Sequence, residues 1–393
     1  MPEPTLPDAL AARVAASGLK RVHVLAWRDL DDVEAGGSEV HAHEVVRRWA
    51  AAGLDVTMRT SYAQGRAAKV ERDGYSVVRK AGRYLVFPRA VLSEIAGRHG
   101  PWDAMVEIWN GVPFFSPLWT GRRPSMVFLH HVHAEMWRMV MPENEHLARG
   151  GELLESKLAP PFYRRTRIVT LSESSKRELV DDLGFRSDHV AVVPPGIHAR
   201  FSPGGERSPH PLVVSVGRLV PVKRGDLLIR ALVAIKHAHP DLEAVLVGEG
   251  YERPLLEQRI ADEGAADWIR LPGRLDDAEV VDLYRRAWVL ASASAREGWG
   301  MTVTEAGACA TPAVVTHIAG HADAVSDRLS GLLVDPLGHA DLAAKLHEIL
   351  GDDVLRKELG EGALRQAAEL TWDATALGAF EVLAAEAERR PGR

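Results

Sequence analysis

Cysteine, long apolar runs and positive net charge are what this sequence has least of. Its single cysteine, Cys309, excludes an internal disulfide, and a cytoplasmic setting is expected. No stretch approaches the roughly 18 apolar residues of a membrane span. The first ten residues include acidic but no basic side chains, unlike a secretory signal. The net charge of −6 argues against a nucleic-acid partner, because phosphate contacts need basic surface.

Known nucleotide-binding signatures are also missing. No Gly-x4-Gly-Lys-Ser/Thr segment occurs, so a P-loop kinase is not supported. A dinucleotide oxidoreductase needs Gly-x-Gly-x-x-Gly directly after a strand, and the segment VGEGYERP (247–254) breaks that pattern after its second glycine.

The chain of 393 residues predicts about two domains. Short runs rich in Val, Ile and Leu are typical of strands buried on both faces of a parallel sheet. These runs are 21–27, 54–60, 104–109, 126–130, 167–172, 212–217, 243–248, 288–293 and 313–316. Amphipathic helices are expected between them, for example at 38–52, 173–183, 226–238 and 276–287. This alternation, occurring twice, indicates two doubly wound α/β domains.

The domain boundary is expected in the linker-like stretch 194–211, which holds five prolines and three glycines. We predict an N-terminal domain at 1–200 and a second domain at 201–371. Residues 372–393 are predicted as a C-terminal helix that returns to the first domain. In such domains ligands bind beyond the carboxyl ends of the strands, so the residues that follow strands are the candidate site.

The segment after the run at 288–293 carries the most chemical information. Glu297 lies in a loop, and Glu305 lies eight residues on, in a helix expected to start near Thr302. Gly298 and Gly300 allow close backbone approach, and the helix N-terminus favours a phosphate. The carboxylates suit hydroxyl groups, so the loop fits a nucleotide sugar. The alternative is a solvated loop residue and an acid that offsets the helix dipole.

The segment after the run at 212–217 places Arg218 and Lys223 beside a turn at Gly217 and the start of a helix. Two cations at a helix N-terminus can neutralise a diphosphate leaving group. A solvated basic loop is the alternative.

These two segments resemble the retaining glycosyltransferases of family 4. Glu297 and Glu305 match the family's Glu-x7-Glu motif, and Gly217, Arg218 and Lys223 match its Gly-Arg-Leu…Lys motif. The pieces VGEG (247–250), LPGRLDDAEVVDLYRRA (271–287) and GGSE (36–39) are also similar to the family's. The resemblance covers roughly residues 21–385. It departs from the family at Arg224, where glycine is frequent, and at residues 195–198.

The resemblance implies the GT-B fold, in which two Rossmann-like domains face each other across a cleft. It implies a retaining transfer of a hexose-type sugar from a UDP- or GDP-sugar to a hydroxyl acceptor, with no metal and no cofactor. Arg218 and Lys223 would hold the donor diphosphate, Glu305 the ribose hydroxyls and Glu297 the transferred sugar. The other donor contacts would be Gly217, Gly273, Arg274, Leu275, Gly298, Trp299, Gly300, Met301 and Thr302.

In the first domain, Gly36 and Gly37 precede a helix expected from near Ser38, so their amides would face the donor phosphate or the acceptor. Asp29 and Asp31 have the spacing of a metal-binding pair. We discount a metal there, because the cations of the second domain already balance the donor's charge.

His130, His131 and His133 follow a predicted strand, and their clustering raises the question of zinc. No cysteine and no further histidine-rich partner is evident. The resemblance instead implies one histidine near the transferred sugar, with His133 favoured as a catalytic residue. A hydrogen-bonded interior histidine is the alternative for each.

Six aromatic residues between Trp109 and Trp137 suggest an acceptor cleft, since aromatic faces pack on sugars or lipids. Packing in the core is the alternative. The acceptor candidates are Trp109, Asn110, His130, His131 and Trp137.

The acceptor class stays open among a sugar, a glycan, a lipid-linked molecule and a small metabolite. Arginines at 122, 123, 164, 165 and 167 could contact anionic lipid headgroups at the inner face of a membrane, or could be solvated. A GT-B sugar-nucleotide epimerase would use the same donor pocket, and a non-catalytic sugar-binding protein would need only binding.

Overall fold

The computed structural model describes residues 5–133, 136–140, 144–336 and 338–390. It divides into two compact units, which are described separately below. Unit 1 comprises Met1–Gly196 and Thr371–Arg393, and unit 2 comprises Ile197–Leu370. The sequence placed these divisions after residues 200 and 371. The last helix belongs to unit 1, as the GT-B resemblance implied.

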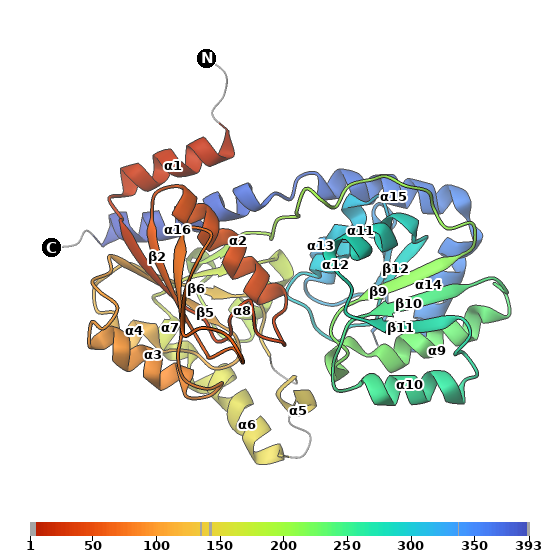
Figure 1. Ribbon diagram of the computed structural model, residues 1–393, viewed down its shortest axis with the longest axis horizontal. Coiled ribbons are helices and arrows are strands. Elements are labelled where there is room, and N and C mark those ends of the chain that lie inside the picture. The colour runs from red at the N-terminus through yellow and green to blue at the C-terminus, as the bar shows by residue number, and fades with distance from the viewer. Residues whose placement is uncertain (1–4, 134–135, 141–143, 337, 391–393) are drawn as a thin grey trace. The chain divides into compact units, whose positions relative to one another are not determined.

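Unit 1 is built on one sheet, of which β2, β5 and β6 are labelled in Figure 1. The strand order of this sheet is β3-β4-β2-β1-β5-β6-β7-β8. All neighbouring strands are parallel except β3 and β4, which form an antiparallel pair at one edge. The strands are β1 (Arg21–Leu25), β2 (Asp55–Thr60), β3 (Lys69–Arg72), β4 (Tyr75–Arg79), β5 (Ala104–Trp109), β6 (Ser125–Leu129), β7 (Arg167–Thr170) and β8 (Val190–Val192).

Two layers of helices enclose this sheet. On one face α16 packs against α1, α2, β6 and β7, around a core that includes Trp49 and Phe380. Right-handed crossovers place α3, α4, α7 and α8 on the other face. The helices are α1 (Leu6–Ser17), α2 (Gly37–Ala51), α3 (Val86–Ile95), α4 (Ser116–Trp119), α5 (Met136–Val140), α6 (Glu145–Leu153), α7 (Pro160–Tyr163), α8 (Glu173–Asp181) and α16 (Trp372–Arg389). A π-helical turn, η1 (Leu154–Leu158), joins α6 to α7.

The sheet of unit 2 is wholly parallel, with the order β11-β10-β9-β12-β13-β14. Counted from β9 as strand 1, this is the 3-2-1-4-5-6 order of the Rossmann fold. Successive strands are added first on one side of β9 and then, from β12, on the other side. The strands are β9 (Leu212–Val216), β10 (Glu243–Val247), β11 (Ile269–Gly273), β12 (Val289–Ser292), β13 (Ala313–Thr316) and β14 (Gly331–Val334).

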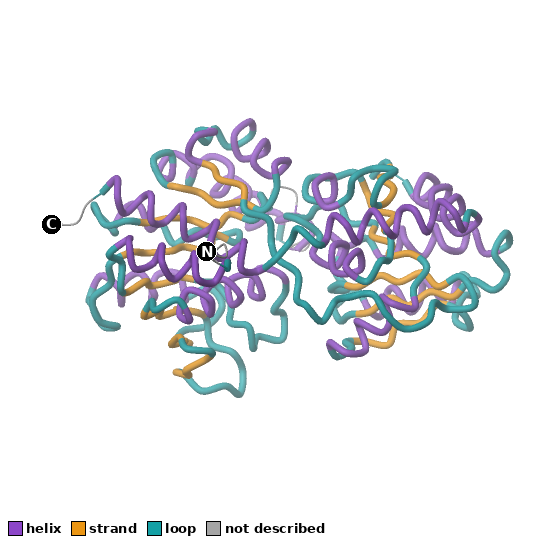
Figure 2. The backbone as a smooth tube through the Cα atoms, turned by 90° about the horizontal axis from the view of Figure 1, so that it is seen from above, coloured by secondary structure: helices purple, strands orange, loops and turns teal. Residues whose placement is uncertain are grey.

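Helices pack in layers around this sheet as well (Figure 2). One layer contains α9, α10 and α14, and the other contains α11, α12 and α15. The helices are α9 (Gly225–Lys236), α10 (Arg253–Asp262), α11 (Asp277–Arg286), α12 (Met301–Ala308), α13 (His321–Ala324), α14 (His339–Gly351) and α15 (Asp353–Ala367). No helix in the described part of the chain is both long and apolar enough to cross a membrane.

All nine predicted apolar runs contain a strand, which confirms the two α/β domains. The boundary between the units, after Gly196, falls inside the predicted linker 194–211, although most of that stretch belongs to unit 2. Arg207 donates hydrogen bonds to the carbonyl oxygens of Tyr284, Ala287 and Ala310, and the Trp288 indole donates to Ser208 O at 2.7 Å. These hydrogen bonds hold the stretch against unit 2. They take the place of the hydrogen bonds that a regular helix or strand would make.

Candidate functional site

The loops after β9 and β12 meet where the strand order of unit 2 reverses. Because β9 and β12 are neighbours in the sheet, residues 217–224 and 293–300 leave the same edge side by side. This is the position at which open α/β sheets bind ligands.

An ion pair joins these two loops. The Lys223 ammonium donates to a carboxylate oxygen of Glu297, and the Ser294 hydroxyl donates to the same oxygen at 2.7 Å. Burial opposes the charge on Glu297, but the charges of Lys223 and His321 and the hydrogen bonds from Lys223 and Ser294 hold its pKa below the ordinary value. The Lys223 side chain is 28% exposed, so an incoming anion can contact it.

Backbone close to this pair is packed too tightly for side chains. A Cβ on Gly320 would lie 2.7 Å from the carbonyl oxygen of Glu297, and one on Gly300 would lie 2.9 Å from the ring of His321. Gly300 caps α12 with a φ of 97°, a conformation that favours glycine. The helix that was predicted to start near Thr302 begins at Met301, so its free N–H groups start directly after this glycine.

Glu305 lies in α12 and is half-buried. Burial raises the pKa of its carboxyl to about 8, with Arg200 opposing and Asp277 reinforcing the rise. The Tyr284 hydroxyl interacts with this carboxyl, and burial raises the pKa of that phenol well above its ordinary value. Glu305 is therefore largely protonated at neutral pH until a ligand or a change of pH removes the proton.

The remaining predicted donor residues have different degrees of exposure. Arg218, Leu275 and the residues 298 and 300–302 are half-buried, and Arg274 is exposed. Gly273 has a φ of 88°, and a Cβ there would meet Glu249 at 2.7 Å. The Trp299 side chain is only 5% exposed, and its indole donates to Thr304 Oγ1 at 3.4 Å. The indole of Trp299 is therefore packed inside unit 2.

The backbone conformation at Arg224 explains why glycine is frequent at this position in the family. Arg224 has a φ of 51° and a ψ of 47°, the left-handed conformation that glycine adopts without strain. Its guanidinium donates to the carbonyl oxygen of Pro336. The side chain thus points to the loop after β14, while its backbone starts α9.

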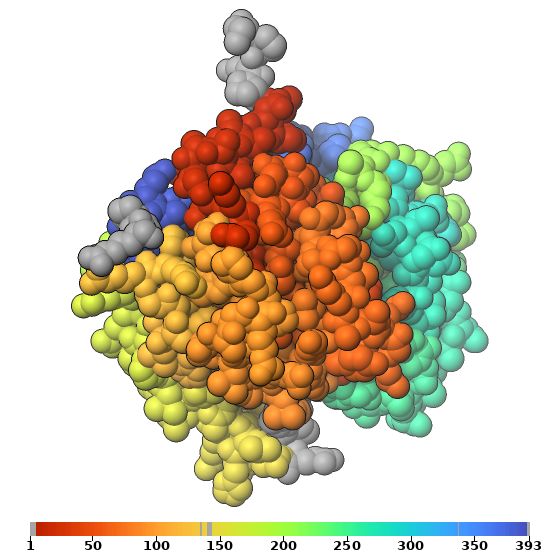
Figure 3. Space-filling model, turned by 60° about the vertical axis from the view of Figure 1, so that its left-hand side comes forward, coloured from red at the N-terminus to blue at the C-terminus, as the bar shows by residue number. Residues whose placement is uncertain are grey.

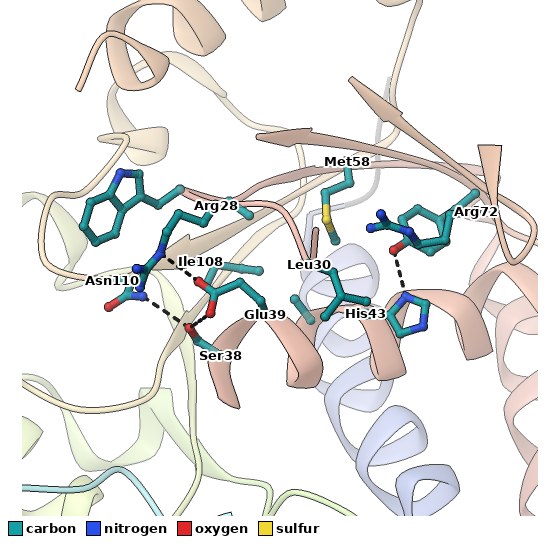
Figure 4. Close-up of a pocket in the computed structure, with 13 residues that line it drawn as sticks. Arg28, Leu30, Ser38, Glu39, His43, Met58, Arg72, Ile108 and Asn110 are labelled. Carbon is teal, nitrogen blue, oxygen red and sulfur yellow. Dashed lines mark hydrogen bonds and ion pairs between the residues drawn. The ribbon is translucent and has the colours of Figure 1, made fainter. Parts of the chain in front are cut away.

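In unit 1 the strand order also reverses, between β1 and β5, and a recess lies at this point (Figure 4). Gly36 N donates to Glu39 Oε2 at 2.8 Å, and Ser38 Oγ donates to the same oxygen at 2.9 Å. Asn110 Nδ2 donates to Ser38 Oγ at 3.3 Å, and Arg28 Nε lies 3.3 Å from Glu39 Oε1. The acceptor candidate Asn110 therefore lines this recess together with Ser38 and Glu39, and Gly36 is joined to it through Glu39.

The carboxylates of Asp29 and Asp31 form ion pairs with two arginines. Arg72 Nη2 contacts Asp29 at 3.1 Å and Asp31 at 2.7 Å, and Arg79 contacts both at 3.1 and 2.6 Å. Burial opposes ionisation of Asp29, but these arginines hold its pKa below the ordinary value. Among the described residues, no group of three or more His, Cys, Asp or Glu side chains is placed to hold a metal ion.

The three clustered histidines have different surroundings. The backbone N–H of His133 donates to both oxygens of Glu155 at 3.0 Å, and its Nδ1 lies 3.3 Å from Glu155 Oε1. The indole of Trp137 donates to the same carboxylate at 3.0 Å. His131 stacks on His133, with their ring centroids 4.8 Å apart. The structure thus brings His131, His133 and Trp137 together around one buried carboxylate.

Two acceptor candidates, Trp109 and His130, lie in the interior, where core packing explains their presence. The side chain of Trp109 is 1% exposed and packs on Tyr163, with ring centroids 4.7 Å apart. His130 is 5% exposed, and its Nε2 lies 3.3 Å from His41 Nδ1. Burial, together with His131, lowers the pKa of His130 to about 3. The aromatic residues Phe114 and Phe128 are also core residues, so core packing explains much of this aromatic segment.

Sequence reasoning missed Ser294, His321 and Glu155. His321 follows β13, the neighbour of β12, and shares an electrostatic interaction with Glu297. Its Nδ1 lies 3.0 Å from the carbonyl oxygen of Thr316, which fixes the ring. Its place after a strand is the signal that could have identified it. Glu155 is the one carboxylate in the stretch 153–166, whose other charged residues are all basic.

Comparison with known families covers most of the chain. The family described as "Glycosyl transferases group 1" matches residues 199–366, and "Glycosyltransferase Family 4" matches residues 35–201. A Streptomyces bingchenggensis protein named D-inositol 3-phosphate glycosyltransferase is 30% identical over 89% of this chain and 85% of its own. A Salinispora arenicola protein of the same name is 35% identical over 55% of this chain and 54% of its own.

Solved structures show the same fold at low identity. Sucrose-phosphate synthase from Thermosynechococcus elongatus has a TM-score of 0.78 at 18% identity, covering 92% of this chain and 98% of its own. Anabaena Alr3699/HepE, solved in complex with UDP and glucose, has a TM-score of 0.73 at 17% identity, covering 93% and 100%. Both comparisons support two Rossmann-like domains in the GT-B arrangement.

Proposed function

This chain is a glycosyltransferase of family 4, and we propose that it moves a hexose-type sugar from a UDP- or GDP-sugar to a hydroxyl acceptor. The transfer would retain the anomeric configuration and need no metal ion or cofactor. The observation that carries the proposal is the Lys223–Glu297 ion pair, where the strand order of unit 2 reverses. It places a cation and a hydroxyl-binding carboxylate side by side, as a sugar diphosphate requires.

In this reaction the bond between the sugar's anomeric carbon and the diphosphate oxygen breaks, and a bond to the acceptor oxygen forms. The leaving diphosphate gains negative charge, which Lys223, Arg218 and the N-terminus of α12 would stabilise. Glu297 would accept hydrogen bonds from the sugar hydroxyls, and Glu305 from the ribose. His133 would lie near the transferred sugar. For retention, the acceptor would attack from the face that the diphosphate leaves, and a departing phosphate oxygen would take its proton.

The comparisons support the donor class only by similarity. The Anabaena structure holds UDP and glucose, and the Streptomyces relative is named for transfer to inositol 3-phosphate. A sugar, a glycan, a lipid-linked molecule and a small metabolite therefore all belong in the acceptor screen.

The test is release of nucleoside diphosphate from UDP- and GDP-hexoses in EDTA, with the anomer of the product determined by NMR. We expect one nucleotide to be preferred, turnover to persist in EDTA, and an α-linked donor to give an α-linked product. An inverted product, or activity that EDTA abolishes and a divalent metal restores, would refute that part of the proposal. Conversion of the donor's sugar into its epimer without an acceptor would indicate an epimerase.

A further inference from the structure

One surface of unit 1 gathers exposed apolar side chains. We define the α3–α4–α7 surface by residues 80–99, 114–124 and 153–166, which form the outer side of one helix layer. Sixteen large apolar side chains are exposed in the described part of the chain, and eight of them belong to these three short segments. The eight are Tyr84, Leu85, Leu92, Ile95, Leu118, Leu153, Leu158 and Phe162.

The charges on the same surface have one sign. Its exposed ionised side chains are Lys80, Arg83, Arg89, Arg98, Arg122, Arg123, Lys157, Arg164 and Arg165. The two carboxylates of these segments, Glu94 and Glu155, are each 1% exposed and bind partners inside unit 1. These three segments therefore carry no exposed acid, although the chain has a net charge of −6. Arg83 is paired with Glu34, which lies outside them.

The three segments lie side by side. Residues of α3 and α4 share one buried cluster that includes Phe87, Phe114 and Trp119. Phe115, next to α4, packs edge-on against Phe162 of α7, with ring centroids 5.8 Å apart. Figure 3 shows orange and yellow parts of unit 1 adjoining across the near face. The segments that carry the exposed apolar and basic side chains therefore adjoin one another on unit 1.

We propose that the α3–α4–α7 surface binds the interface of an anionic lipid bilayer. Exposed leucine, isoleucine and phenylalanine side chains can enter the boundary between headgroups and acyl chains, while the surrounding arginines and lysines contact lipid phosphates. A nucleic acid would be attracted by the same charges but would gain little from eight exposed side chains that are mostly aliphatic. A lipid surface would contact both the exposed apolar side chains and the basic ones.

The binding surface adjoins the acceptor candidates of unit 1. Leu153 and Leu158 flank Glu155 in the chain, and Glu155 accepts hydrogen bonds from His133 and Trp137. Contact with a bilayer would thus hold the segment that positions His133. The inference does not depend on the proposed transfer reaction, although it favours a lipid-linked acceptor if that reaction is correct.

The test is co-sedimentation of the full chain with vesicles. We expect binding to phosphatidylcholine–phosphatidylglycerol vesicles, weakening with added salt, and little binding to phosphatidylcholine alone. The double change Arg164→Glu with Arg165→Glu should weaken binding roughly tenfold or more, because each basic side chain near the surface contributes severalfold. Leu158→Ser with Phe162→Ser should weaken it even at low salt.

Matched controls lie in unit 2, where Leu255 is 61% exposed and Lys357 is exposed. Leu255→Ser and Lys357→Glu should bind vesicles as the unchanged protein does. A melting temperature close to that of the unchanged protein shows that each variant is folded. The proposal is overturned if the unchanged protein ignores anionic vesicles at low salt, if the controls lose as much binding as the test variants, or if the surface binds single-stranded RNA but not vesicles.

Discussion

Lys223 is the side chain on which the proposed transfer depends most directly, because it is a partly exposed cation at the donor loops. Replacing it with alanine should lower the rate constant for sugar transfer about 100- to 1000-fold, as loss of one transition-state contact does. The melting temperature should fall, because Glu297 loses the cation that offsets its burial, but the variant should remain folded. Steady-state kinetics and thermal unfolding of Lys223→Ala measure both.

The matched control for that experiment is Lys357→Ala, which removes an exposed lysine from α15. It should keep full turnover. If Lys223→Ala is folded and transfers sugar at the unchanged rate, Lys223 does not contact the leaving group.

Glu305 offers a test by pH. Its ordinary pKa of 4.5 rises to about 8 in the folded protein. Between these values the folded protein keeps a proton that the unfolded chain releases, so the free energy of unfolding falls as the pH rises. Glu305→Gln removes this titration, so the variant should gain stability relative to the unchanged protein across that window. Urea unfolding at several pH values measures the difference.

Above the folded-state pKa the difference between the two proteins should become constant. Glu361→Gln, an exposed change in α15, serves as the control and should leave the pH profile unaltered. Parallel profiles for Glu305→Gln and the unchanged protein would contradict the buried, protonated state.

At the scale of single residues, the sequence identifies residues that belong to a known motif more readily than residues that only the fold brings together. The motifs identified Lys223 and Glu297, and the structure brings these two into contact. Ser294 and His321 join them only through the folding of the loops after β12 and β13, which no spacing reveals. The burial of Trp109 could not be predicted, because an aromatic side chain at the end of a strand can point inward as readily as outward.

At the scale of elements, the start of α9 carries a measurable strain. Arg224 adopts a left-handed backbone conformation, which costs a residue with a Cβ about 1–2 kcal/mol. Arg224→Gly and Arg224→Ala both remove the guanidinium contact with Pro336, but only glycine relieves the backbone. The glycine variant should therefore be more stable than the alanine variant by about 1 kcal/mol, measured by urea unfolding.

The same comparison on a right-handed residue should reverse the order. Arg230 lies inside α9, where glycine is less stable than alanine by about 1 kcal/mol. If the alanine variant at Arg224 equals or exceeds the glycine variant, the backbone at that position is not strained.

Most elements could be predicted because parallel strands buried on both faces read as apolar runs. The β3–β4 pair was not predicted, since β3 lies at the sheet edge and its burial alternates between exposed and partly buried residues. The stretch 194–211 does contain the domain boundary, but its packing on unit 2 was not predicted. Its prolines and glycines exclude regular structure, but side chains such as Arg207 still bind it to unit 2.

At the scale of the whole molecule, each unit has a strand-order reversal with polar residues at the carboxyl edge. In unit 2 the edge carries Lys223 and Glu297, and in unit 1 it carries Ser38, Glu39 and Asn110. The sequence could predict both edges, because motifs that follow strands mark them. It could identify arginines at 122, 123, 164 and 165 as candidates for lipid contact, but not the α3–α4–α7 surface as a whole, which is assembled from three segments that are distant in the chain.

Hydrogen–deuterium exchange of the full chain with and without UDP, GDP or ADP, in EDTA, tests the central claim most directly. A bound ligand protects the amides that it contacts or orders. We predict that one nucleotide slows exchange in peptides covering residues 217–224 and 293–305, and that Lys223→Ala weakens this protection. Unchanged exchange in both loops with all three nucleotides, or protection confined to other parts of the chain, would contradict a nucleotide-sugar site built on Lys223 and Glu297.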